Sequence, residues 1–225
     1  KKILYYFFFI LIIQIINCEV EVCENSKEKD VSEKSSSLLS KIRTIGDPIL
    51  SKISRELTID EILHDIQIKE AITIGHQTLK EFRQKVGYGR AIAAPQFGYN
   101  IQMICLNLGT PQTLFNPKII FKSDDTFMMW DDCLSFPDLM VSVQRHKSIS
   151  ITFQDENGEL VTWNNLPQDI SELLQHEIDH LNGILAVDIA VKPTGNCREE
   201  EGECLAIIPR SDWLDDKEKY EKWLY

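Results

Sequence analysis

Two segments of the chain place apolar side chains at the three- and four-residue spacing of an amphipathic helix. The first opens with Thr58 and Glu61, a capping pair typical of a helix start, and ends at Gly87, a natural helix stop. The second covers residues 169–181. The pattern therefore predicts one long helix from Thr58 to Gly87 and a second helix nearer the C-terminus.

Apolar runs rich in β-branched and aromatic residues predict strands between and around these helices. They lie at residues 101–108, 114–121, 141–153 and 160–163. Residues 155–158, Asp-Glu-Asn-Gly, have the Asn-Gly signal of a hairpin turn that would join the last two strands. A helix, several strands and another helix indicate an α+β fold.

The chain begins with two lysines and an apolar run from Ile3 to Ile16, shorter than the roughly 20 residues that cross a bilayer. Residues 1–18 therefore resemble a signal peptide. Ile16 occupies a site where cleavage favours a small residue, so an uncleaved anchor and a buried strand stay as alternatives. Residues 19–40 are polar and Ser-rich, which predicts a disordered linker or leader, and the globular part is expected from residue 41.

The composition narrows the possible functions. Of the 225 residues, 43% are hydrophobic and 26% are charged, as in an ordinary globular protein with one main domain. The formal net charge is −11 and the sequence has no basic arm, which argues against nucleic acid as the main partner. Six cysteines are too few for a disulfide scaffold.

The second predicted helix carries a metal-binding pattern, His-Glu-Ile-Asp-His, at residues 176–180. A helix places residues four apart on one face, so His176 and His180 can bind one metal ion, unless they are simply surface histidines. Glu177 lies beside them and can take a proton from water that zinc or iron has made acidic. Cys133 is the best candidate for a third ligand, although a cysteine after an apolar stretch is often only a small buried hydrophobe.

A third segment, residues 89–96, follows the first predicted helix. Its small residues allow close backbone approach, and Gln96 offers an amide that can donate to an oxyanion, although alone the segment can also be a tight connection. The order Ala-Ala-Pro-Gln, then Cys-Leu-Ser, then Gln-His-Glu-Ile-Asp-His resembles the peptide deformylase family over residues 42–191. The resemblance implies a deformylase-like domain at 41–195, with β-sheets wrapped around a central helix that carries the H-E-x-x-H motif.

The resemblance also implies a cofactor and a substrate. Cys133, His176 and His180 would hold one divalent metal ion, with Fe(II) expected and Zn(II), Ni(II) or Co(II) as alternatives. The substrate would be the N-formyl group on the N-terminal methionine of a newly made polypeptide, released as formate. We expect an N-formylated peptide as partner, no nucleic acid, no stable membrane span if the N-terminal segment is cleaved, and a monomer.

Catalytic roles follow from the same resemblance. Glu177 would be the general base that accepts a proton from water and delivers it to the leaving amine. Gln96 and the backbone N–H of Leu134 would hold the oxyanion. Arg145 would form an ion pair with Asp131, two residues before the cysteine.

Residues expected to bind substrate include departures from the family pattern. Arg90 and Ala91 follow Gly89 where the family has a hydrophobic residue and a glycine, and Asp132 precedes the cysteine where Gly or Ala is usual. With Met129, these residues are expected to line the methionine pocket. Arg90 would either turn to solvent and lay its stem along the pocket, or point inward and pair with a substrate acid or a carboxylate such as Asp132. A metallohydrolase for another N-acyl peptide or small amide, and a catalytically silent binding module, are the alternatives.

The acidic extension, residues 196–225, lies outside the resemblance. Cys197 and Cys204 have a spacing compatible with a local disulfide, and residues 212–225 predict a short amphipathic helix that packs on its own domain. The signal-like start suggests the secretory pathway or an organelle reached through it, with a mitochondrion or plastid as the alternative.

Overall fold

A computed structural model describes residues 37–193, 195 and 204–224. The signal-like segment, nearly all of the predicted linker, and Cys197 lie outside these residues. Among the described residues, no helix is long and apolar enough to cross a membrane. The helices are α2 (Ile59–His64), α3 (Ile66–Val86), α4 (Gln168–Leu181), α5 (Arg210–Asp215) and α6 (Lys217–Lys222), and the strands are β1 (Ala91–Ala93), β2 (Met103–Asn107), β3 (Pro111–Lys122), β4 (Thr126–Asp131), β5 (Leu139–His146), β6 (Ile149–Gln154), β7 (Leu160–Trp163) and β8 (Ile207–Pro209).

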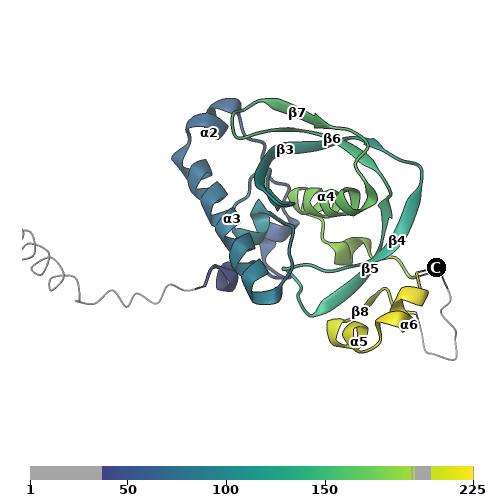
Figure 1. Ribbon diagram of the computed structural model, residues 1–225. Coiled ribbons are helices and arrows are strands. Elements are labelled where there is room, and N and C mark those ends of the chain that lie inside the picture. Colours follow the sequence, from purple (N-terminus) through teal and green to yellow (C-terminus); the bar gives the residue numbers. More distant parts are fainter. Residues whose placement is uncertain (1–36, 194, 196–203, 225) are drawn as a thin grey trace, which may run out of the picture. The chain divides into compact units, whose positions relative to one another are not determined.

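Two antiparallel sheets surround α4. The first has the strand order β1-β2-β3-β6-β7 and the second has the order β4-β5-β8. Figure 1 shows α4 enclosed by strands of both sheets, with α3 outside them. One face of α4 packs its leucines and Ile178 against apolar side chains of β2, β3 and β6. The expected α+β fold, with sheets around a central helix, is confirmed.

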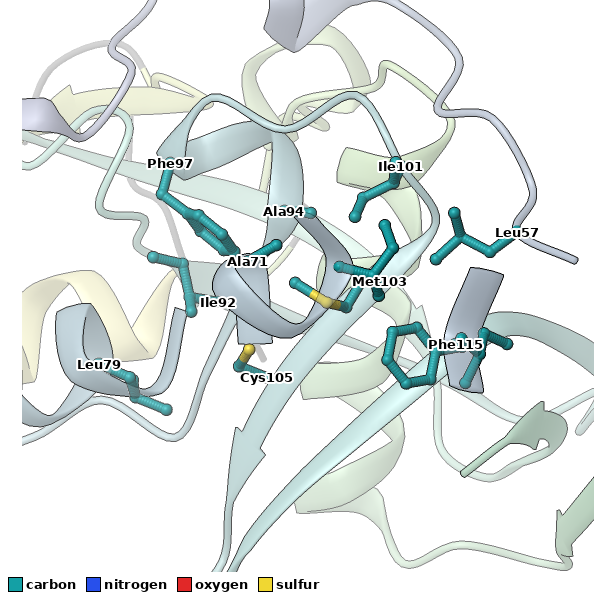
Figure 2. Close-up of a cluster of buried hydrophobic side chains, with 12 residues drawn as sticks. Leu57, Ala71, Leu79, Ile92, Ala94, Phe97, Ile101, Met103, Cys105 and Phe115 are labelled. Atoms are coloured by element: carbon teal, nitrogen blue, oxygen red, sulfur yellow. The ribbon is translucent and has the colours of Figure 1, made fainter. Parts of the chain in front are cut away.

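The long helix α3 packs on the outer side of the first sheet. Figure 2 shows Ala71 and Leu79 of α3 in a buried cluster with Ile92, Phe97 and Cys105. Gly75 allows the close approach, because a β-carbon there would lie 2.4 Å from the Cys105 sulfur. This cluster also packs against the segment from β1 to Phe97, which carries part of the functional site.

The predicted helix from Thr58 to Gly87 is two helices. The capping box of Thr58 and Glu61 begins α2, and Gly87 ends α3 in the left-handed conformation, so both predicted ends are confirmed. Asp65 interrupts the run with an extended backbone, and its side chain accepts a hydrogen bond from the Gln67 N–H at 2.7 Å. An aspartate competes for backbone donors in this way, which apolar spacing alone does not reveal.

The predicted strand at 141–153 is also two elements, β5 and β6, which belong to different sheets. The chain passes from one sheet to the other at Lys147 and Ser148. Their backbone groups form hydrogen bonds with the segment that connects β3 and β4. Both halves have the same β-type composition, so the pattern could not show the break. β7, the hairpin turn at residues 155–158 and the helix at 169–181 are confirmed, with α4 starting one residue earlier.

Candidate active site

Helix α4 brings His176, Glu177 and His180 into the interior, with exposed fractions of 8%, 4% and 1%. Gln175 fixes the helix to β5, because its amide donates to the His146 carbonyl at 2.9 Å and accepts from the His146 N–H at 3.0 Å. This attachment and the packing of the apolar face of α4 against the first sheet fix the rotation of the helix. As a result, one ring nitrogen of His176 and one of His180 point towards the end of β4.

Cys133 follows β4 and completes a cluster with the two histidines. The Cys133 sulfur lies 3.2 Å from His180 Nε2, which lies 3.2 Å from His176 Nε2. All three ligand atoms lie within 4.8 Å of one another, and all three residues are buried. A thiolate and two imidazoles this close together form a donor set for a catalytic transition-metal or zinc ion. Three protein ligands leave the fourth coordination position of such an ion open.

Two donors stabilise the Cys133 sulfur. Gln96 Nε2 donates to it at 3.2 Å, and the Ser135 N–H donates at 3.4 Å. The Gln96 amide has a defined orientation, because its oxygen accepts from the Ala93 N–H at 2.8 Å. The amide NH₂ therefore points into the site, as the oxyanion role requires. Leu134, the other expected oxyanion residue, lines the same pocket.

Asp131 orients the first histidine. Its carboxylate contacts His176 Nδ1 at 3.0 Å and Arg145 at 3.1 Å, so the other histidine nitrogen faces the cluster. Arg145 also pairs with Asp179. Burial alone would raise the pKa of Asp131, but His176 and Arg145 outweigh burial and lower it to about 2. A histidine held by a buried carboxylate is typical of the second layer around a metal ligand.

Glu177 has the environment of a proton acceptor. Burial raises its pKa to about 7. One carboxylate oxygen, Oε2, is buried and has no hydrogen-bond partner among the described residues. A buried oxygen without a donor is unfavourable by about 1–3 kcal/mol, so this atom is suited to a water or substrate proton.

Gln96, Cys133, His176 and Glu177 line a pocket of about 510 Å³, whereas His180 is not among its lining residues. The five residues expected to bind substrate all line it, and they are Gly89, Arg90, Ala91, Met129 and Asp132. Residues not singled out from the sequence also form the wall, among them Phe82, Val86, Tyr88, Glu172, Leu173 and Arg210. Glu172 could have been identified from the sequence as a residue of this wall. It lies four residues before His176, and a helix places both on one face.

Arg90 does not pair with Asp132, the carboxylate given as an example for the inward-pointing arrangement. Arg90 instead pairs with Glu172 and donates to the Asp169 carbonyl at 2.7 Å. Asp132 pairs with Arg210, at 2.6 Å. The partners lie 82 and 78 positions apart in the sequence, so no local pattern links them. Burial raises the pKa of Glu172 despite the opposing effect of Arg90.

Comparisons with known proteins agree with this site. The family model described as polypeptide deformylase matches residues 39–195. A peptide deformylase of Pseudothermotoga lettingae is 31% identical over 68% of this chain and 83% of its own length. One of Dictyoglomus thermophilum is 33% identical over 72% of this chain and all of its own length.

Solved structures give the same result. A peptide deformylase from Synechococcus elongatus in complex with actinonin has a TM-score of 0.59 and 30% identity, and the match covers 73% of this chain and 82% of that one. The fold and the site thus define a metal-dependent hydrolase. The chain belongs to the polypeptide deformylase family, and the family and enzyme class expected from the sequence are confirmed.

Proposed function

We infer that this chain removes the formyl group from the N-terminal methionine of newly made polypeptides and releases formate. The observation that carries this inference is that Cys133, His176, Glu177 and Gln96 line one pocket, and that His180 completes the metal-ligand cluster with Cys133 and His176. Two imidazoles, a thiolate, a carboxylate and an amide supply metal ligands, a base and an oxyanion donor for hydrolysis of an amide.

Cys133, His176 and His180 would hold the metal ion, which we propose to be Fe(II), with Zn(II), Ni(II) or Co(II) able to replace it. When bound, such an ion acts as a Lewis acid that polarises an oxygen and lowers the pKa of water. A mixed sulfur and nitrogen donor set suits these ions and does not suit Mg²⁺ or Ca²⁺, which prefer oxygen.

The protein residues account for the proton and charge transfers. The oxygen of water forms a bond to the formyl carbon, and Glu177 accepts the proton that water loses. Gln96 Nε2 donates to the oxygen on which negative charge develops. The carbon–nitrogen bond then breaks, and Glu177 delivers the proton to the amine, which leaves as the free N-terminus of the peptide. The products are formate and the deformylated peptide.

The wall of the pocket fits a methionine side chain along part of its surface. Val86, Met129 and Leu173 are apolar lining residues. Burying a thioether against such residues stabilises the complex by roughly 25 cal/mol per Å² of apolar area. The Arg90–Glu172 pair also lines the pocket, but each charge is neutralised by its partner.

The proposal is tested by formate release from formyl-Met-Ala-Ser, with acetyl-Met-Ala-Ser as the competing substrate. We expect release of formate and about one divalent ion per chain by elemental analysis. Cys133→Ser should remove both metal and activity, whereas Cys105→Ala, at the other free cysteine among the described residues, should retain both.

The two alternatives predict different results. Preferred cleavage of the acetyl peptide would indicate a hydrolase for another N-acyl group. A chain that contains neither metal nor activity would indicate a silent binding module.

A further inference from the structure

The C-terminal extension reaches the pocket, although it lies beyond the residues that the family model matches. β8 pairs with β5 through Ile208 and Met140, which makes it the third strand of the second sheet. Arg210 follows directly, and its backbone N–H donates to the Asp138 carbonyl at 2.8 Å. Asp138 lies in the loop that follows Cys133, so the backbone of Arg210 is attached close to the proposed metal site.

The Arg210 side chain connects two walls of the pocket. One terminal nitrogen donates to Asp132, at 2.6 Å, and the other donates to the hydroxyl of Tyr88. The guanidinium also lies 5.4 Å from the centre of the Tyr88 ring. Tyr88 belongs to the segment between α3 and β1, whereas Asp132 directly precedes Cys133. Arg210 thus holds both segments in place at the edge of the site.

This edge is the open end of the pocket. Glu177, at the reacting end, is 4% exposed, the Arg210 side chain is 21% exposed, and Tyr88 is 46% exposed. A peptide whose formyl group reaches Glu177 has to continue towards solvent from its second residue onwards. The exposed end, where Tyr88 and Arg210 lie, provides that path.

The chemistry of Arg210 favours a neutral acceptor. A guanidinium has five N–H donors, and its described hydrogen bonds use two of them. Asp132 already neutralises the positive charge, and Glu172 lines the same pocket, so an additional acid gains little there. A main-chain carbonyl, by contrast, accepts a hydrogen bond without bringing another negative charge.

We propose that Arg210 is a specificity-determining residue that donates to a main-chain carbonyl of the substrate beyond the formyl-methionine. This inference rests on the proposed deformylase function and adds to it. The extension then supplies part of the affinity for the peptide beyond the formyl-methionine, whatever side chains follow.

The test compares substrates of increasing length. KM and kcat are measured for formyl-Met, formyl-Met-Ala-amide and formyl-Met-Ala-Ser-amide with the unmodified chain, Arg210→Ala and Arg210→Lys. Arg210→Ala should raise KM about tenfold for the longest substrate, leave its kcat within about twofold, and leave formyl-Met unchanged. Arg210→Lys should recover part of the loss. Lys217→Ala, in the same extension and outside the pocket lining, should change nothing.

Three outcomes would overturn the proposal. An equal loss on all three substrates would show that Arg210 only holds Tyr88 and Asp132 in place. No loss on any substrate would show that it makes no substrate contact. A loss confined to formyl-Met-Ala-Glu-amide, compared with formyl-Met-Ala-Gln-amide, would identify a carboxylate as its ligand.

A binding measurement separates this proposal from the deformylase function. Calorimetry on Glu177→Gln, with and without Arg210→Ala, measures the affinity of the same peptides without turnover. The length-dependent loss should appear there too. If the unmodified chain releases no formate, the deformylase proposal fails, while the calorimetry still decides whether Arg210 recognises the peptide chain.

Discussion

Arg90 and Glu172 form an ion pair within a pocket wall that also contains Val86, Met129 and Leu173. The Arg90 side chain is 42% exposed and the Glu172 side chain is 14% exposed, so the arginine remains partly hydrated while the glutamate depends on its partner. Removing one member of such a pair costs more than replacing both, because a buried charge is then left alone.

The Arg90–Glu172 pair leads to a prediction about stability. Arg90→Ile alone should lower the free energy of unfolding by about 1–3 kcal/mol, since the Glu172 carboxylate loses its charged donor. The double variant Arg90→Ile/Glu172→Leu should recover most of this loss and make the wall apolar. Its kcat/KM for formyl-Met-Ala-Ser should rise by up to about tenfold. Urea unfolding and formate release measure the two effects, and equal stability of the single variant and the unmodified chain would contradict the first.

Glu177 gives a second prediction at this scale. Glu177→Gln keeps the size of the side chain and removes its basicity, so metal content should be unchanged. The chemical step should slow by roughly 10²–10⁴-fold, as expected when a general base is lost. Metal per chain and single-turnover formate release are the measurements. A variant that keeps its rate would place the base elsewhere.

At the scale of elements, the end of α4 is fixed by contact with the segment at residues 51–54. Gly183 has φ +72°, and a β-carbon there would lie 2.7 Å from the Ser51 carbonyl carbon. The Ser54 N–H donates to the Leu181 carbonyl at 2.8 Å. The helix that bears His176 and His180 is thus attached through its C-terminal end to the N-terminal part of the domain.

Gly183→Ala should therefore be more destabilising than a change that alters backbone preference alone. Gly87 is the matched control, because it has φ +85° and, apart from its two chain neighbours, no residue places an atom within 4 Å of the position that its β-carbon would take. Both substitutions should cost about 1–2 kcal/mol for the left-handed conformation. The contact with Ser51 should add about 1–3 kcal/mol at Gly183 only. Urea unfolding of both variants makes the comparison, and equal losses would show that the Ser51 segment moves aside.

At the scale of the whole molecule, the C-terminal extension packs on the second sheet. Trp130 of β4 lies in a buried cluster with Tyr220, Trp223 and Leu224, and its indole N–H donates to the Tyr220 carbonyl at 2.8 Å. The expected amphipathic helix is two short helices, α5 and α6, and its packing on its own domain is confirmed. Because Trp130 directly precedes Asp131, this packing supports the strand that leads to Cys133.

Trp223→Ala tests how much the extension contributes to stability. Trp223 is 3% exposed, so its removal should lower the free energy of unfolding by about 3–5 kcal/mol. Leu214→Ala, at a residue of the same extension that is 53% exposed, should change stability by at most about 0.5 kcal/mol. Denaturant unfolding followed by tryptophan fluorescence measures both. Similar small losses would show that the cluster is not part of the cooperative fold.

The sequence by itself determined the features that depend on neighbours along the chain. The capping box at Thr58, the stop at Gly87 and the spacing of His176 and His180 are local, and backbone geometry alone converts them into structure. The three ordered motifs also indicated the family and the metal site, because such chemistry requires a few residue types at set spacings.

Only the tertiary structure decided which distant residues meet. Arg90 pairs with Glu172 across 82 positions, and Arg210 reaches Asp132 across 78. The break at Asp65 and the change of sheet after His146 are likewise invisible in apolar spacing. The physical reason is that charges and strands choose partners by distance in space, where several carboxylates and several sheet edges satisfy the same local pattern. The fold selects among them by the apolar area that it buries and the charges that it leaves paired.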